Sequence, residues 1–327
     1  MATYKKDKGV NVKSYTEDPD RTGPAAFEGQ LYYNSSDGQF KYIGIGTGAW
    51  GSGGNLNTAR DNMASIGVSN TAALAAGGSP GNKNNVETYD GSSWTETTEI
   101  NTARTYAQGQ FGTSTSGIIS GGGPGNVVES WDGSSWTEST EINTSRSALG
   151  GSGASNTSGI IFGGDAGPAV AANTEYWNGS SWAEQSDLNT ARKIFGSGGG
   201  TVYTAAIAAA GDAGPPAPSS DSAEEWNGST WTEISSVNTG RHQNSGTTAG
   251  APDSFLIFGG NPNRTVTESW DGSSWTEVAD LSGGRHSLGG AGSGTSAVAF
   301  GGNNPPPVTN ATEEWTVTHA FKKVTTG

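Results

Sequence analysis

The chain has 327 residues and carries 17 Lys and Arg against 31 Asp and Glu, a formal net charge of −14 at pH 7. This negative charge makes the protein a poor match for nucleic-acid phosphates. The absence of cysteine excludes disulfide frameworks, cysteine-ligated zinc and thiol catalysis. No run approaches 18 apolar residues and the N-terminus has no apolar signal segment, so we expect neither membrane insertion nor a secretory leader.

The first 46 residues resemble nothing later in the chain. Lysines at 5, 6, 8 and 13 precede the acidic turn TEDPDRTGP. Residues 31–40, LYYNSSDGQF, predict a β-hairpin, because Asp-Gly between aromatic-bearing strands favours a tight turn. We interpret residues 1–46 as an extended arm that anchors the chain to other proteins or to further copies of itself. A disordered terminus is the alternative.

From residue 47 onward the chain repeats a unit of about 45 residues, a period typical of β-propellers. Five copies contain an aromatic residue, then Asp/Asn-Gly-Ser-Ser/Thr, then a tryptophan, and Asn-Thr-x-Arg or a relative begins seven residues after that tryptophan. The repeated arginines, spaced 44, 42, 46, 49 and 44 residues apart, are Arg60, Arg104, Arg146, Arg192, Arg241 and Arg285.

Each unit predicts four antiparallel strands, which we label a to d. Strand a follows the arginine and is rich in Gly, Ala and Ser, as in RSALGGSGA. Strand b is an apolar run that ends in Gly-Gly, as in GIIFGG. Strands c and d form a hairpin about the Asp-Gly or Asn-Gly turn. Four such strands make one propeller blade.

The tryptophans give the predicted number of blades. Six units carry a strand-c ring (Tyr89, Trp131, Trp177, Trp226, Trp270 and Trp315), but only five carry the strand-d tryptophan (Trp94, Trp136, Trp182, Trp231 and Trp275). The segment GTGAWGSGGNLNTAR aligns with DGSSWTETTEINTAR and places Trp50 opposite Trp94. We therefore predict an all-β fold in which a six-bladed propeller (residues 47–318) is closed by an N-terminal strand, with the arm (1–46) before it and a C-terminal tail (319–327) after it.

Two resemblances follow from these motifs. Gly-Gly at the end of strand b, followed by an aromatic residue and a tryptophan, resembles the Kelch repeat of β-propellers and covers about residues 47–318. The segment FEGQLYYNSSDGQFKYIGIGTGAW is similar to a short hairpin segment of bacteriophage tail-fibre and other virion proteins. The second resemblance implies a virion component that is made in the host cytoplasm.

The repeated arginines have two interpretations. A glutamate precedes each strand-c ring (Glu87, Glu129, Glu175, Glu224, Glu268 and Glu313), so the simplest is one structural ion pair per blade. The alternative is an arginine ring at the mouth of an axial channel that holds an anion. We expect no catalytic residue, cofactor or metal site, because the serines lie in turns without matching histidines and His242 and His286 have no third ligand.

The b–c loops break the repeat most strongly, in length and in proline content, and antiparallel strands place them on the same face as the Asn-Thr-x-Arg connections. Because binding residues concentrate on loops over rigid scaffolds, we predict a recognition face there; unselected drift of the loops is the alternative. The candidate residues are Asn82, Lys83, Pro124, Asn126, Asp165, Pro168, Asp212, Pro215, Pro216, Asn261, Arg264, Asn303 and Pro306.

These observations favour a structural protein of a bacteriophage virion, a tail fibre or similar appendage. It would not be an enzyme. Residues 1–46 would bind other virion proteins, and the loop face would adhere to host-surface polysaccharide or protein. We expect an anionic polysaccharide to meet the arginine-bearing side. Three alternatives stay open: a capsid or neck decoration protein, a cellular Kelch-type interaction scaffold, and a carbohydrate-active enzyme.

Overall fold

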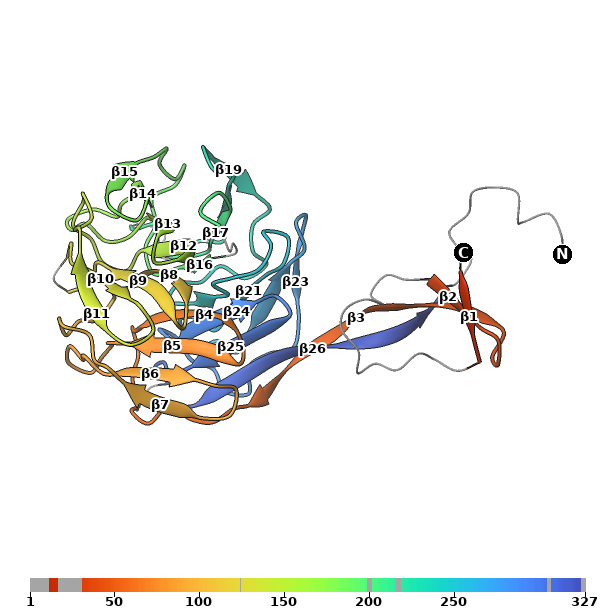
Figure 1. Cartoon of the computed structure of the whole chain (residues 1–327). Helices are drawn as coiled ribbons and strands as arrows, with labels where there is room; N and C mark the ends of the chain where they lie inside the picture. Colours follow the sequence, from red (N-terminus) through yellow and green to blue (C-terminus); the bar gives the residue numbers. More distant parts are fainter. Residues whose placement is uncertain are drawn as a thin grey trace. The chain divides into compact units, whose positions relative to one another are not determined.

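A computed structural model describes residues 12–16, 31–123, 125–198, 202–215, 219–304 and 307–324. These residues form 26 strands and no helix. The chain divides into two compact units, one made of residues 1–48 and 317–327 and the other of residues 49–316 (Figure 1). Strands β3 (Gln39–Ser52) and β26 (Thr312–Lys323) contribute residues to both units, so the described part of the expected C-terminal tail includes the end of a strand.

The first unit contains the hairpin that the sequence predicts. Strand β2 (Leu31–Asn34) pairs antiparallel with β3, and β1 (Lys13–Tyr15) pairs parallel with β2. In the turn the Asn34 side-chain oxygen accepts hydrogen bonds from the backbone amides of Ser36 (3.0 Å) and Asp37 (3.3 Å). This bonding explains why an Asn-Ser-Ser-Asp-Gly segment forms the turn here.

Residues 49–316 contain a series of antiparallel sheets. Each four-stranded sheet is formed by one repeat, and its strands a to d follow one another in chain order. The four-stranded sheets are β4 (Ala64–Ser69), β5 (Ala72–Ala76), β6 (Val86–Tyr89), β7 (Trp94–Thr97); β8 (Gly109–Thr113), β9 (Ser116–Ser120), β10 (Val128–Trp131), β11 (Trp136–Ser139); β12 (Gly150–Ser155), β13 (Ser158–Phe162), β14 (Thr174–Trp177), β15 (Trp182–Glu184); β16 (Gly196–Gly198), β17 (Ala206–Ala209), β18 (Ala223–Trp226), β19 (Trp231–Ile234); and β20 (Ser245–Gly246), β21 (Phe255–Phe258), β22 (Thr267–Trp270), β23 (Trp275–Glu277).

The remaining sheet combines the last repeat with the N-terminal strand. Its order runs β24 (Gly289–Ser293), β25 (Ser296–Phe300), β26 and then β3. The Trp50 indole N–H donates to Thr267 Oγ1 at 3.0 Å, as the Trp94 indole donates to Thr312 Oγ1 and the Trp231 indole to Thr174 Oγ1. Trp50 therefore bonds as Trp94 and Trp231 do, which agrees with the alignment that pairs it with Trp94. The other strand-d indoles, of Trp136, Trp182 and Trp275, donate to backbone carbonyls.

Burial explains the composition of strands a and b. The apolar run of strand b is covered on both sides; Ile160, Ile161 and Phe162 are wholly buried. Strand a needs small residues because neighbouring sheets approach closely there: a Cβ on Gly151 would lie 2.5 Å from the carbonyl oxygen of Gln110 on β8. The tryptophans fill the space between sheets, as Trp94 does between Phe300 (ring centroids 4.7 Å apart) and Tyr89 (4.9 Å).

The second residue after each repeated arginine has a left-handed backbone, with φ between 45° and 59°. These residues form a cycle of backbone hydrogen bonds of 2.7–3.0 Å, in which each amide donates to the carbonyl of the preceding member and the first amide donates to the last carbonyl. The members are Asn62, Tyr106, Ala148, Ile194, Gln243 and Ser287, and we call them the hydrogen-bond cycle.

The sheets follow one another in chain order around the unit of residues 49–316, so that β24 of the last repeat lies against β4 of the first (Figure 1). Repeated four-stranded antiparallel sheets that succeed one another in this way are compatible with a β-propeller. The fold is all-β in the described residues, as the sequence predicts.

Candidate recognition site

The variable loops and the Asn-Thr-x-Arg connections lie against each other. The residue after a repeated arginine forms a backbone bridge to the residue after the Gly-Gly of strand b, as Ser147 does to Asp165 and His286 to Asn303. Lys193 bridges in the same way to Asp212, which follows Ala210-Gly211 in the fourth repeat. Both elements therefore belong to one face, and the antiparallel order of the strands puts the Asp-Gly turns at the opposite end of each sheet.

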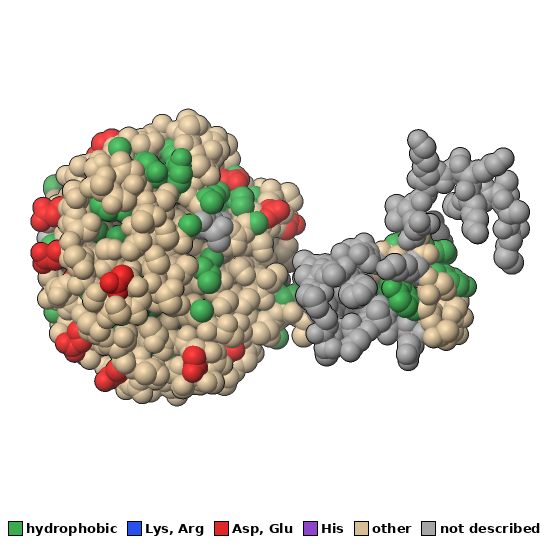
Figure 2. All heavy atoms as spheres, in the orientation of Figure 1, with side chains coloured by type: hydrophobic (Ala, Val, Ile, Leu, Met, Phe, Trp, Pro, Cys, Tyr) green, Lys and Arg blue, Asp and Glu red, His purple; other side chains and the backbone are tan. Residues whose placement is uncertain are grey.

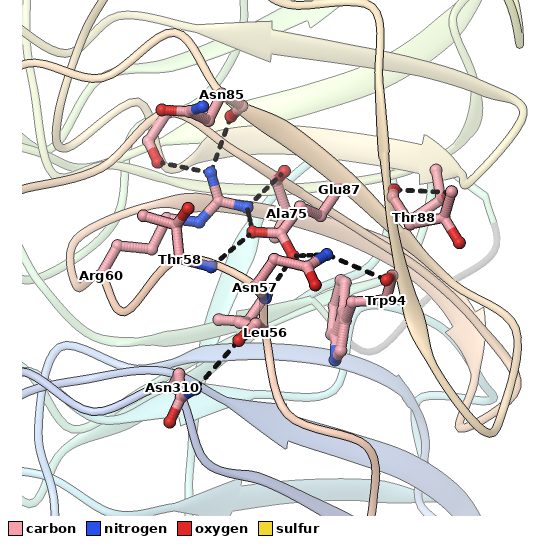
Figure 3. A network of polar contacts seen from close by, with 12 residues as sticks. Leu56, Asn57, Thr58, Arg60, Ala75, Asn85, Glu87, Thr88, Trp94 and Asn310 are labelled. Atoms are coloured by element: carbon pink, nitrogen blue, oxygen red, sulfur yellow. Dashed lines mark hydrogen bonds and ion pairs between the residues drawn. The ribbon is translucent and has the colours of Figure 1, made fainter.

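Beneath this face each repeated arginine is engaged by a glutamate of its own sheet. Figure 3 shows the first copy, in which Arg60 Nη2 lies 3.0 Å from Glu87 Oε1 and Nη1 donates to the carbonyl of Asn85 at 2.7 Å. The Glu87 carboxylate also accepts from the Asn57 backbone amide (2.7 Å) and side-chain amide (3.0 Å). The Asn-Thr-x-Arg motif thus docks on one buried carboxylate.

The other copies repeat this arrangement. The ion pairs are Arg104 with Glu129, Arg146 with Glu175 (3.1 Å), Arg192 with Glu224 (2.7 Å), Arg241 with Glu268 (3.0 Å) and Arg285 with Glu313 (3.0 Å). The six arginines are 0–3% exposed, and this burial lowers the pKa of each guanidinium while the paired glutamate opposes the shift. An anion held by an open arginine ring would need exposed guanidinium groups, which these six residues do not provide.

Two of the variable loops border an open pocket of about 350 Å³. Both loops begin with the same tetrapeptide, Asp-Ala-Gly-Pro, at residues 165–168 and 212–215. The polar lining consists of Asp165, Asp212 and Lys193, and the rest of the lining is Pro168, Ala169, Val170, Gly214 and Pro215. We call this cavity the DAGP pocket; its volume lies within the range of small-molecule sites.

The DAGP pocket brings together four of the residues that the sequence predicts for recognition, namely Asp165, Pro168, Asp212 and Pro215. Sequence reasoning missed Lys193, which forms an ion pair with Asp165 (Nζ to Oδ2, 2.6 Å). The sequence contained a signal for Lys193, because it is the only lysine that directly follows a repeated arginine.

The other predicted recognition residues that the structure describes are dispersed along the variable loops, outside the lining of the DAGP pocket. Asn126 donates to Glu141 Oε2 at 2.6 Å, and Asn261 donates to Gln243 Oε1 at 3.0 Å. Asn82, Lys83, Arg264 and Asn303 lie on the same loops and are partly buried or exposed. Pro124, Pro216 and Pro306 lie outside the described residues.

The histidines of this face lie in the connections. Burial lowers the pKa of His242 and of His286, and Asp212 and Asp61, respectively, oppose that shift. His242 Nδ1 is 2.9 Å from Ser219 Oγ, and His286 Nδ1 is 2.8 Å from Asn263 Oδ1. In the part of the chain that the structure describes, no three His, Asp or Glu side chains are grouped to hold a metal ion.

The charge balance of the surface is strongly acidic. Residues 49–316 contain nine Lys and Arg against 25 Asp and Glu, and six of the nine basic residues are the buried arginines. Figure 2 shows acidic side chains scattered over the visible face of this unit, with no Lys or Arg visible among its described residues. Lys83, Lys193 and Arg264 are the basic residues left to act at the surface.

No protein-family model matches this chain, and no curated protein matches its sequence. The Kelch and virion interpretations therefore stay predictions. Separately, the described residues contain no helix that is long and apolar enough to cross a membrane.

Proposed function

We propose that residues 49–316, which include Trp50 at the end of β3, form a closed, six-bladed, Kelch-like propeller. The hydrogen-bond cycle supports this proposal, because its six members come from six repeats and the last one bonds to the first. The place of β3 beside β26 supports it too, since the N-terminal strand completes a sheet that the last repeat leaves one strand short. Such a join removes the free edge at which two sheets of different molecules would pair.

We further propose that the protein is a structural component of a bacteriophage virion, a tail fibre or similar appendage, that contacts the host surface without catalysis. The observation that carries the adhesive role is the DAGP pocket, which lies on irregular loops above a scaffold with a repeated buried ion pair. The resemblance of residues 27–50 to tail-fibre segments supports the virion role, and the hairpin of that segment supports a docking function for the arm. Several weak contacts on one particle would sum through avidity.

The test uses particles produced from the phage genome that encodes the chain. We expect the chain to co-purify with intact particles and immunogold against it to label an appendage that reaches the host. Label on the capsid or neck would favour a decoration protein instead. Absence from particles, with capture of a cellular complex, would favour the Kelch-type scaffold, and turnover of host glycans would favour the enzyme.

A further inference from the structure

The DAGP pocket combines groups of both signs in fixed positions. The backbone amide of Gly167 donates to Asp165 Oδ1 at 3.0 Å, and the amide of Gly214 donates to Asp212 Oδ1 at 2.8 Å. Each carboxylate is therefore held by its own loop. The glycine at the third position of Asp-Ala-Gly-Pro has positive φ in both copies, which lets the loop turn back over its aspartate.

Lys193 links the two loops. Its backbone exchanges two hydrogen bonds of 2.9 Å with the backbone of Asp212. Its side chain reaches the other loop and pairs with Asp165, where burial of both side chains is only partial (25% and 35% exposed). The ammonium group and the two carboxylates thus remain within reach of solvent and of a ligand, while their relative positions are set by the fold.

The charges of the pocket exclude two classes of ligand. An anion would meet two carboxylates in a unit whose exposed surface is already acidic. The expectation of an anionic polysaccharide depended on accessible repeated arginines, and these arginines are buried. A cation would be repelled by the Lys193 ammonium, which already pairs with Asp165 and leaves Asp212 as the other carboxylate of the lining. A neutral hydroxyl group both donates and accepts hydrogen bonds, so it can bond to the carboxylates and to the ammonium together.

The remaining lining suits the same class of ligand. Pro168, Ala169, Val170 and Pro215 present carbon and hydrogen atoms next to the polar groups. A pyranose ring has hydroxyl groups at its edge and C–H groups on its faces, so it matches a polar edge beside an apolar wall. The cavity of about 350 Å³ has room for one or two such rings.

We propose that the DAGP pocket binds a neutral hexose unit of a surface glycan. This inference rests on the proposed adhesive function and names the class of ligand that the adhesive site binds. Asp212 and Asp165 accept from ligand hydroxyl groups, and Lys193 donates to one. Single contacts of this kind are weak, and repetition of the chain on a particle supplies the avidity.

Saturation-transfer NMR of the full chain tests the inference, with methyl glycosides of neutral hexoses, the matching uronic acids and a short lysine peptide as probes. We expect a neutral glycoside to bind in the millimolar range and the uronic acid at least tenfold more weakly. Asp212→Asn keeps the shape and removes the charge, so it should weaken binding about tenfold, roughly the loss of one hydrogen bond to a charged group. Asp132→Asn, in a turn of the opposite face, is the matched control and should bind as the parent does.

Three results would overturn the inference: no neutral glycoside binds at tens of millimolar, the uronic acid binds as well as the neutral sugar, or the lysine peptide binds instead. A competition experiment, in which the purified protein competes with particles for binding to host cells, distinguishes failure of the hexose inference from failure of the proposed adhesive function. If the parent and Asp212→Asn compete equally well, adhesion stands and the assigned pocket is wrong. If the parent does not compete, the adhesive function itself is wrong.

Discussion

The backbone amide of Asn62 donates a hydrogen bond of 2.9 Å to the carbonyl oxygen of Ser287, which joins the first repeat to the last. Five further bonds of the same kind complete the hydrogen-bond cycle, and the left-handed backbone of its members aims each amide at the neighbouring repeat. Because the cycle and the Trp50 strand both connect the two ends of the repeat array, the stability of residues 49–316 should depend on the N-terminal strand.

Two truncations test that dependence. Removal of residues 1–46 keeps Trp50, its bond to Thr267 and its packing on Phe258 (ring centroids 5.0 Å apart), so the unit should stay folded. Removal of residues 1–54 takes the tryptophan and its strand away and should lower stability by at least ~3 kcal/mol, the lower end for tryptophan truncation in a core. Thermal unfolding of both proteins measures the difference. Equal melting temperatures would contradict the closure proposed for the fold.

The buried carboxylate of Glu87 should be far more important for stability than its cross-strand neighbour Glu96. Glu87→Gln leaves the Arg60 guanidinium buried without its counter-ion, and loss of one partner of a buried pair costs about 3–5 kcal/mol. Glu96 lies opposite Glu87 on β7 and is exposed, so Glu96→Gln should change stability by less than ~0.5 kcal/mol. Urea unfolding compares the two; similar losses would show that the repeated pairs do not hold the connections.

The Asp-Gly turns should make the protein sensitive to acid. Hydrogen bonds from Ser92 and Ser93 lower the pKa of Asp90 to about 2, and the equivalent bonds from Ser273 and Ser274 lower the pKa of Asp271 to about 2. A pKa below the unfolded value of ~3.9 means that this stabilisation is complete above about pH 5 and is lost as the pH falls toward 2.

Two natural turns provide the comparison for this prediction. Asn178 and Asn227 accept the same two amide bonds, at 2.9 Å and 3.0 Å, without a titrating group. A variant with Asn at positions 90, 132 and 271 should therefore lose less of its melting temperature between pH 5 and pH 2 than the parent does. Parallel decreases in the two proteins would show that other carboxylates dominate acid unfolding.

Asn244 gives a prediction of increased stability. It is 6% exposed, and in the described residues neither its side-chain oxygen nor its nitrogen has a hydrogen-bond partner. The equivalent position, three residues after the arginine, is Leu149 and Leu288 in two other repeats. Asn244→Leu should raise the free energy of unfolding by about 1 kcal/mol, because two unsatisfied polar atoms leave the interior. Asn244→Ala, which leaves a cavity, should gain less. A loss of stability for the leucine variant would indicate that ordered water satisfies this side chain.

The sequence predicted the strands of the repeats, because they depend on residue types that recur at a fixed spacing, and it predicted the hairpin of the arm from its turn residues. The glutamate partner of each arginine was identifiable for the same reason. The hydrogen-bond cycle was not, since its members (Asn, Tyr, Ala, Ile, Gln and Ser) share a backbone conformation and no side-chain chemistry. The DAGP pocket was found only in part, because Lys193 lies outside the variable loops and contacts them through its backbone at Asp212 and its side chain at Asp165.

The most direct test of the account exchanges the variable loops on the particle itself. Grafting a short GPGN loop in place of residues 212–221 removes Asp212 and Pro215 from the pocket and leaves the flanking strands β17 and β18 unchanged. The same graft in place of NNPPPVTNA, far from the pocket in the chain, is the control. We predict that the first graft keeps the melting temperature within a few degrees and reduces particle adsorption to host cells at least tenfold, while the control adsorbs nearly as the parent does. Unchanged adsorption of the first graft would contradict recognition at this site.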